Sequence, residues 1–250
     1  MAGITIKSSR EIELMREAGK LLRDVHNRLA EEVAPGISTL DIDKLGEELI
    51  RKTGSIPSFL NYEGYPASVC VSINDEVVHG IPKADRIIQD GDIISLDIGL
   101  IHNGWQSDAA RTHAVGNVSK EALDLIRVTE QSFFEGIKYA IAGNHLHDIS
   151  NAIGNYCIDR GYGVVYDLVG HGIGREMHEP PQIPNFPQKR KGVLLCAGMT
   201  LAVEPMINIG RGDVKFLDDG WGCVTEDGTL SAHYENTILI TDGEPEILSL

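Results

Sequence analysis

Two stretches near the start of the chain carry apolar residues at the spacing of amphipathic helices. The first opens at Ser8, with Glu11 three residues later in the pattern of a capping box, and continues to Pro35-Gly36. The second stretch predicts a helix from Leu40 to Lys52. We therefore expect two helices in succession before any sheet begins.

Strand patterns follow these helices. An aromatic loop, FLNYEGYPASVC, leads into a strand expected from Ser68 to Ile73. The next run, IISLDIGLIHNGWQSDAART, predicts a hairpin that turns at Asn103-Gly104, because Asn-Gly favours the tight turns that join antiparallel strands. The sheet should therefore be antiparallel at this point.

The second part of the chain repeats this order. It predicts a helix from about Lys120 to Ile141, another from about Leu146 to Asp159 that Gly161 stops, and then a strand, YGVVYDL. The glycine- and proline-rich segment Gly170–Phe186, GHGIGREMHEPPQIPNF, predicts a rigid, non-helical loop that displays its side chains. Three strand runs follow, punctuated by Asp219-Gly220, Asp227-Gly228 and Asp242-Gly243.

Two helices followed by sheet, twice over, indicate an α+β fold with pseudo-twofold symmetry. The halves would span about residues 8–115 and 118–250 of a single domain, 1–250. A chain of 250 residues with ordinary apolar content can bury a sufficient core without disulfides or a partner chain. We therefore expect one compact globular unit.

The composition of the chain limits the cellular compartment and the classes of binding partner that we expect. No segment has the uninterrupted apolar length of a signal peptide or a membrane span, which predicts a soluble protein. The four cysteines are scattered without a Cys-x-x-Cys pair, as expected of reduced thiols in the cytoplasm. With 37 acidic against 22 basic residues and a net charge of −15, nucleic acid is a disfavoured partner.

Four carboxylates stand in strand patterns where buried apolar side chains are normal. Asp97 interrupts DIISLDIGL, and Asp108 follows eleven residues later on the returning arm of the hairpin. Glu204 interrupts MTLAVEPMINI, and Glu235 begins ENTILI. Any one of them could cap a turn, pair with an arginine or face water. Four together require neutralisation, because an unpaired buried carboxylate is costly.

Lysines and arginines are too scarce near these strands to neutralise four acids, which leaves protonation or bound divalent cations. Metal is the simpler explanation. Four negative charges match two divalent ions, and His171 could join the same ligand set. Such a pair of ions would activate a shared water and polarise a carbonyl, which is the chemistry of metal-assisted amide hydrolysis.

The nine histidines are harder to sort, because a lone histidine is usually a surface or structural residue. His79, in NDEVVHGIP, could present its ring to a cleft, and His113 is undecided. His233 lies two residues before Glu235 and would share its face of a strand, where a hydrogen bond to a ligand is an option. HEPPQ is not a zincin helix, because its prolines break a helix, and GHGIG lacks the context of a dinucleotide fingerprint.

These motifs together resemble those of type I methionine aminopeptidases of the bacterial form, over essentially the whole chain. The match rests on INDEVVHGIP, SLDIG with its acid eleven residues on, GHGIGREMHEPPQIPN, AVEPMIN and the glutamate of HYENT, in the family's order and spacing. The resemblance implies the pita-bread fold, with two pseudo-symmetric halves around a two-metal site. It also implies removal of the initiator methionine from polypeptides whose second residue is small.

The resemblance implies a role for each matching residue. Glu204 corresponds to the group that accepts a proton from the metal-bound water, His178 to the contact with the scissile amide, and His79 to a group that stabilises the tetrahedral intermediate or the leaving amine. The implied metal ligands, with Asp108 and Glu235 bridging, are Asp97, Asp108, His171, Glu204 and Glu235. The methionine pocket matches Tyr62, Tyr65, Cys70 and Trp221, and should also be lined by Phe59 and Met177.

The implied cofactor is a pair of divalent ions, with manganese, iron(II), cobalt and zinc as candidates. A carboxylate-rich site with one imidazole suits manganese or iron(II) better than a structural zinc. Phe59 and Met177 stand where the family commonly has Cys and Phe, and His233 and Asn236 stand where it commonly has Gln and His. These departures leave the matching ligands intact and bear on the shape of the pocket and the choice of metal.

The implied partners are the N-termini of newly made polypeptides, acted on by a monomer in the cytoplasm, and association with ribosomes is left open. Two other functions fit parts of the pattern. A proline-specific aminopeptidase or dipeptidase of the same fold would use a similar ligand set, although such relatives usually carry an extra N-terminal domain for which this length leaves no room. A non-catalytic binding module is the other, and the five intact ligand positions disfavour it.

Overall fold

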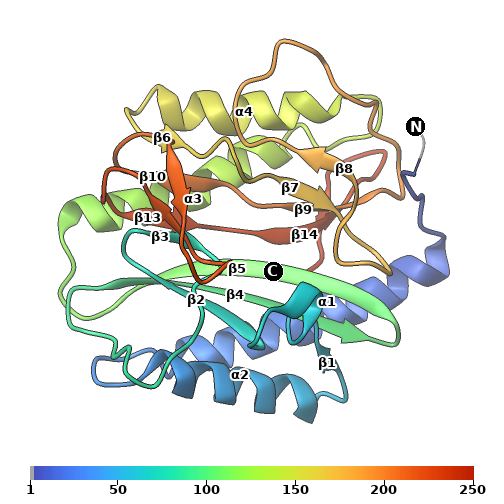
Figure 1. Cartoon of the computed structure of the whole chain (residues 1–250). Helices are drawn as coiled ribbons and strands as arrows, with labels where there is room; N and C mark the ends of the chain where they lie inside the picture. Colours follow the sequence, from blue (N-terminus) through green and yellow to red (C-terminus); the bar gives the residue numbers. More distant parts are fainter. Residues whose placement is uncertain (1–2) are drawn as a thin grey trace.

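The computed structural model describes residues 3–250 as an α+β fold, with β-sheets between two pairs of helices (Figure 1). The helices are α1 (Ser9–Ala30), α2 (Thr39–Lys52), α3 (Lys120–Ile137) and α4 (Leu146–Ile158), with a 3-10 turn η1 (Tyr62–Gly64). The strands before α3 are β1 (Ile56–Pro57), β2 (Val69–Ile73), β3 (Glu76–Val78), β4 (Ile93–His102) and β5 (Trp105–Ala114). Those after α4 are β6 (Gly163–Val164), β7 (Gly170–Gly172), β8 (Glu179–Ile183), β9 (Thr200–Val203), β10 (Met206–Asn208), β11 (Val214–Phe216), β12 (Cys223–Thr225), β13 (Ser231–His233), β14 (Asn236–Leu239) and β15 (Glu246–Ile247).

The sheets connect the two parts of the chain. In the first part, β4 is the central strand and pairs with β1, β2 and β5. In the second part, the strand order is β15-β14-β9-β7-β8, and a smaller sheet has the order β13-β10-β6. A second small sheet, β11-β12-β3, joins a strand that precedes α3 to two that follow α4. All of these pairings are antiparallel, including the β4–β5 hairpin, for which the sequence predicted it.

Each pair of helices covers its own apolar core. Leu22 of α1 and Ile42 of α2 pack with Leu96 of β4 in one core, and all three are essentially inaccessible to solvent. In the other core, α3 and α4 pack against the sheet of β9 and β14. Two helices followed by sheet, repeated once, is the pseudo-twofold α+β arrangement that the sequence predicted. Within residues 3–250, no helix combines the length and apolarity needed to cross a bilayer.

The helix starts follow the sequence closely, whereas two helix ends do not. The backbone N–H of Ser8 donates to the Glu11 carboxylate at 2.8 Å, so the expected capping box is present. The prediction that the first helix runs to Pro35-Gly36 is wrong, because α1 ends at Ala30 and the chain continues in tight turns. Similarly, α3 ends at Ile137, and Ile141 instead forms a β-bridge with Thr241. A tertiary pairing therefore ends the regular helix earlier than its apolar pattern suggests.

The strand predictions were right at the hairpin and less accurate after α4. Asn103 and Gly104 both adopt positive φ, 52° and 79°, as a type I′ turn requires. Of YGVVYDL, only Gly163–Val164 is a strand, because only these two residues pair with β10. The expectation that Gly170–Phe186 is a loop throughout was also wrong. Residues 170–172 and 179–183 pair as β7 and β8, so the non-strand parts of the segment are residues 173–178 and 184–186.

Candidate active site

The four carboxylates lie at the seam where the sheet of β4 and β5 meets the strands that follow α4. At this seam the N–H of Glu235 donates to the carbonyl of Ala110 at 2.9 Å. The Thr237 hydroxyl donates to the Asp108 carbonyl at 2.9 Å and accepts the Asp108 N–H at 3.0 Å. Backbone hydrogen bonds therefore set the positions of Asp108 and Glu235 relative to each other, although 127 residues separate them.

The hairpin places both of its aspartates on one face. Asp97 lies opposite Ala110 in the β4–β5 ladder, and Asp108 lies opposite Gly99. Since Asp108 is two residues before Ala110, the two aspartates are diagonal neighbours whose side chains point to the same side. The spacing of eleven residues across the turn thus brings them together, as the sequence predicted.

The second sheet brings His171 to Glu204 in the same way. His171 in β7 lies opposite Ala202 in β9, and Glu204 follows Ala202 by two residues on the same face. Pro205 comes next and separates β9 from β10, so the glutamate lies at the end of its strand. The His171 Nε2 atom lies 3.7 Å from Glu204 Oε1 and 4.0 Å from Asp108 Oδ2.

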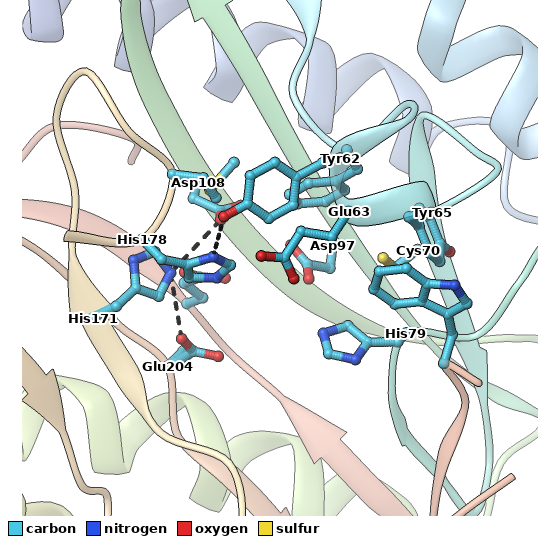
Figure 2. A pocket seen from close by; sticks show the side chains of 14 residues that line it. Tyr62, Glu63, Tyr65, Cys70, His79, Asp97, Asp108, His171, His178 and Glu204 are labelled. Atoms are coloured by element: carbon cyan, nitrogen blue, oxygen red, sulfur yellow. Dashed lines mark hydrogen bonds and ion pairs between the residues drawn. The ribbon is translucent and has the colours of Figure 1, made fainter.

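One cavity of about 170 Å³ collects every residue that the sequence proposed for the site (Figure 2). Figure 2 shows His171 and His178 on one side of the carboxylates, and His79 and Cys70 on the other. The residues that line the cavity are Phe59, Tyr62, Glu63, Tyr65, Cys70, His79, Asp97, Asp108, His171, Met177, His178, Glu204, Trp221 and Glu235.

The acids form an electrostatically unfavourable cluster. Burial raises the pKa of all four carboxyl groups, and the charges of the neighbouring carboxylates raise it further for Asp108, Glu204 and Glu235. Among residues 3–250, no lysine or arginine forms an ion pair with any of them. Oδ1 of Asp97, Oδ1 of Asp108 and Oε1 of Glu235 have no hydrogen-bond partner in the described part of the chain. Buried, acidic and unpaired oxygen donors are suitable ligands for divalent cations. Bound cations would remove both the repulsion between the carboxylates and the cost of leaving their oxygens without partners.

His171 is prepared to act as a nitrogen donor in this cluster. Its Nδ1 lies 2.9 Å from the carbonyl of Gly172, which can only accept, so Nδ1 carries the proton and Nε2 keeps its lone pair. Burial, followed by the charge of His178, lowers the pKa of His171 to about 4. The ring is therefore neutral at physiological pH, with its free nitrogen toward the acids. Asp108, His171 and Glu235 each place one donor atom within 4.8 Å of the others, close enough to share an ion.

Two further histidines stand around the cluster. His178 Nδ1 and the Tyr62 hydroxyl are hydrogen-bonded at 2.8 Å, and the His178 ring lies 4.4 Å from that of His171. When Tyr62 donates to Nδ1, the proton of His178 is on Nε2, where it can be donated to a bound molecule. His79 has a left-handed backbone, φ 60°, which is strained for a residue other than glycine and is typical of functional positions. Its ring meets Trp221 edge to face at 6.2 Å.

The remaining lining residues form an apolar pocket beside the acids. Phe59 and Met177 meet over Gly99, where an added Cβ would lie 2.9 Å from Met177 Cε and from Phe59 Cε1. Tyr65 packs edge to face on Trp221, with ring centroids 5.1 Å apart. Burial raises the pKa of the Cys70 thiol, so it remains a neutral, weakly polar part of the wall. The pocket suits a flexible, polarisable apolar side chain.

Sequence reasoning missed Glu63 and undervalued His233. Glu63 lines the cavity, but an acid in a loop gives no sign of its direction. His233 is buried, with its Nε2 3.7 Å from Glu204 Oε2 and 3.9 Å from Glu235 Oε2. The period-two relation to Glu235 was the available signal. His113, which was undecided, lies outside this cavity and lines a hollow beside α1.

Comparison with known proteins gives the class. A family model described as metallopeptidase family M24 matches residues 13–242. The methionine aminopeptidase of Clostridium acetobutylicum is 53% identical over 247 residues, 99% of each chain. The crystal structure of methionine aminopeptidase from Rickettsia prowazekii superposes with a TM-score of 0.97 at 39% identity, covering 99% of this chain and 100% of that one. An Xaa-Pro dipeptidase from Bacillus anthracis has a TM-score of 0.79 at 24% identity, covers 98% of this chain and 61% of its own, and shares the fold alone.

The chain belongs to metallopeptidase family M24. Its fold is the pita-bread fold, as the resemblance implied. A divalent-metal hydrolase is therefore the class that the fold and the family define.

Proposed function

We propose that this metallopeptidase is a methionine aminopeptidase, which removes the N-terminal methionine from polypeptides whose second residue is small. The observation that carries the proposal is the junction, in one cavity, of the buried acid cluster and the apolar pocket lined by Phe59 and Met177. The pocket suits a thioether side chain, and it opens directly beside the groups that would act on the following peptide bond. The names of the relatives support the same activity.

The ions would be held by Asp97, Asp108, His171, Glu204 and Glu235. When bound, two divalent ions polarise the scissile carbonyl and lower the pKa of a shared water. Glu204 would accept the proton of the attacking water, because it lines the cavity beside His171, with its Oε1 3.7 Å from the His171 Nε2 atom. His178, oriented by Tyr62, would donate a hydrogen bond to the scissile amide. His79 lies across the cavity from His178, where it would stabilise the tetrahedral intermediate or the leaving amine.

We further propose that the enzyme works as a monomer in the cytoplasm, on N-termini of newly made chains. The four free cysteines support a reducing compartment. Ribosomes are the place where such N-termini first emerge, so association with them is compatible with the role. With a net charge of −15, that association would not depend on direct contact between this chain and RNA.

The alternative within the same fold is cleavage of Xaa-Pro peptides. A comparison of Met-Ala-Ser with Ala-Pro and Met-Pro dipeptides, with added manganese(II) or cobalt(II), separates the two activities. We expect hydrolysis of Met-Ala-Ser that falls steeply when the second residue is changed from alanine to leucine. A preference for Xaa-Pro would overturn the proposal.

A non-catalytic role is tested with variants of the acid cluster. Glu204→Gln and His171→Ala should each lower kcat by at least about a hundredfold while the protein stays folded, because the first removes the proton acceptor and the second a metal ligand. Circular dichroism and thermal melting of the metal-free proteins check the fold. Turnover that stays unchanged in both variants would refute the site.

A further inference from the structure

His233 is a buried imidazole whose ring forms no hydrogen bond within residues 3–250. It ends β13 with only 1% of its surface exposed, and neither of its ring nitrogens has a hydrogen-bond partner in the described chain. Its backbone is held firmly, because its N–H donates to the Thr112 hydroxyl at 2.9 Å and its carbonyl accepts from that hydroxyl at 2.9 Å. Burying two polar atoms without hydrogen bonds destabilises the folded protein.

The ring lies against the acid cluster, near the oxygen of Glu204 that is not the one closest to His171. Its Nε2 is 3.7 Å from Glu204 Oε2, whereas His171 Nε2 is 3.7 Å from Oε1 of the same carboxylate. It also lies 3.9 Å from Glu235 Oε2. Both distances are too long for hydrogen bonds. They match the separation of two donor atoms on one ion, about 3 to 4 Å for metal–ligand bonds of roughly 2.0–2.2 Å.

The donors in this cluster form two triads that share one carboxylate. Asp108, His171 and Glu235 form one, and Glu204, His233 and Glu235 form the other, with the donor atoms of each triad within 4.8 Å of one another. Each triad has one imidazole and two carboxylates. His171 Nε2 lies 4.0 and 3.7 Å from carboxylate oxygens of Asp108 and Glu204. His233 Nε2 lies at similar distances, 3.7 and 3.9 Å, from carboxylate oxygens of Glu204 and Glu235.

We propose that His233 is a second imidazole ligand of the metal centre, binding through Nε2 together with Glu204 and Glu235. The inference depends on one part of the proposed function, the binding of metal ions in this cluster, and not on the reaction that the protein catalyses. A second nitrogen donor strengthens binding of cobalt(II), iron(II) and zinc more than that of manganese(II), because imidazole suits those ions and affinity rises along the same series. The chain should therefore prefer cobalt(II) over manganese(II) more strongly than a site with one imidazole.

The test is metal binding to the protein, measured apart from turnover. The metal-free wild type, His233→Gln and a control, His113→Gln, are titrated with cobalt(II) and with manganese(II) by calorimetry. Gln keeps polarity and similar size but offers no imidazole. His113 is a suitable control because its Nε2 is likewise buried without a partner in the described chain, yet it lines a different hollow. Chelator-treated samples of all three are compared by thermal melting, which shows that they are folded.

We expect His233→Gln to lower cobalt(II) affinity by at least about tenfold more than it lowers manganese(II) affinity. The control should keep both affinities. In the cobalt-loaded wild type, pulsed electron paramagnetic resonance should count two coordinated imidazoles, and this measurement does not depend on any variant folding. One imidazole in the wild type would overturn the proposal, as would an unchanged cobalt-to-manganese ratio in His233→Gln. If the wild type binds two imidazoles but does not cleave Met-Ala-Ser, only the proposed function fails.

Discussion

Asp97→Asn should make the metal-free protein more stable, although it removes a proposed metal ligand. Burial raises the pKa of Asp97 from 3.8 to about 7, so ionising this carboxyl in the fold is unfavourable. Three pKa units correspond to a ceiling of about 4 kcal/mol. The charges of Asp97 and Asp108 act on each other, so the two carboxyl groups titrate together and we expect about half of that ceiling, ~2 kcal/mol. For a chain of this size, the gain corresponds to roughly 4–8 °C in Tm.

The sign of the effect fixes its pH dependence. Because the folded pKa lies above the unfolded value, the stability contributed by the protonated carboxyl is complete below about pH 4 and is lost as pH rises toward 7. An asparagine carries no such charge. The stability advantage of Asp97→Asn should therefore be near zero at pH 4 and fully developed at pH 8.

Thermal melting in the presence of a chelator measures this advantage, at pH 4 to 8. Asp159→Asn, at the exposed C-cap residue of α4, is the matched control and should leave Tm unchanged within a degree. Added cobalt(II) should raise the Tm of the wild type, because a hundredfold excess over Kd adds about 2.7 kcal/mol to the free energy of unfolding, and it should raise the Tm of the variant much less. If the variant is no more stable than the wild type in chelator at pH 8, the acid cluster is not the destabilising element described here.

Other substitutions and conditions test the remaining parts of the structure. Tyr62→Phe removes a hydrogen bond to His178 worth about 1 kcal/mol, so steady-state kinetics should show kcat lowered about fivefold, and no change would separate Tyr62 from catalysis. Gly99→Ala should raise KM for Met-Ala-Ser more than it lowers kcat, because the new methyl group fills the pocket below Met177. Leu22→Ala should cost about 2–5 kcal/mol in urea unfolding, since Leu22 is fully buried. Calorimetry at pH 6 should show weaker metal binding than at pH 7.5, because burial raises the carboxyl pKa values and protons compete for the ligands.

The parts of the fold that local chemistry determines were predictable from sequence. The Ser8 cap, the start of α3 and the Asn103-Gly104 turn each depend on residues a few positions apart, and all three lie where expected. The ends of α1 and α3 were both placed too late, and for α3 a remote contact explains the difference. Ile141 leaves helical geometry to pair with Thr241, a hundred residues away, and its local apolar pattern cannot show that.

The same distinction applies to the candidate site. A carboxylate in an apolar strand is conspicuous, so Asp97, Asp108 and Glu235 could be singled out from sequence. The relation of His233 to Glu235 was readable from strand periodicity. Its distance to Glu204 was not, because it depends on how β14 pairs with β9 and β13 with β10.

The cluster also bears on why the two halves stay together. Asp97 and Asp108 come from the part of the chain before α3, whereas His171, Glu204 and Glu235 come from the part after α4. Docking the two sheets brings the acids into mutual repulsion away from water, so the seam is unfavourable by itself at neutral pH. Neither part holds the complete ligand set, so bound ions would link the halves and remove that repulsion together. Ion binding should therefore stabilise the contact between the halves, and a sequence selected only for stability would not keep these acids.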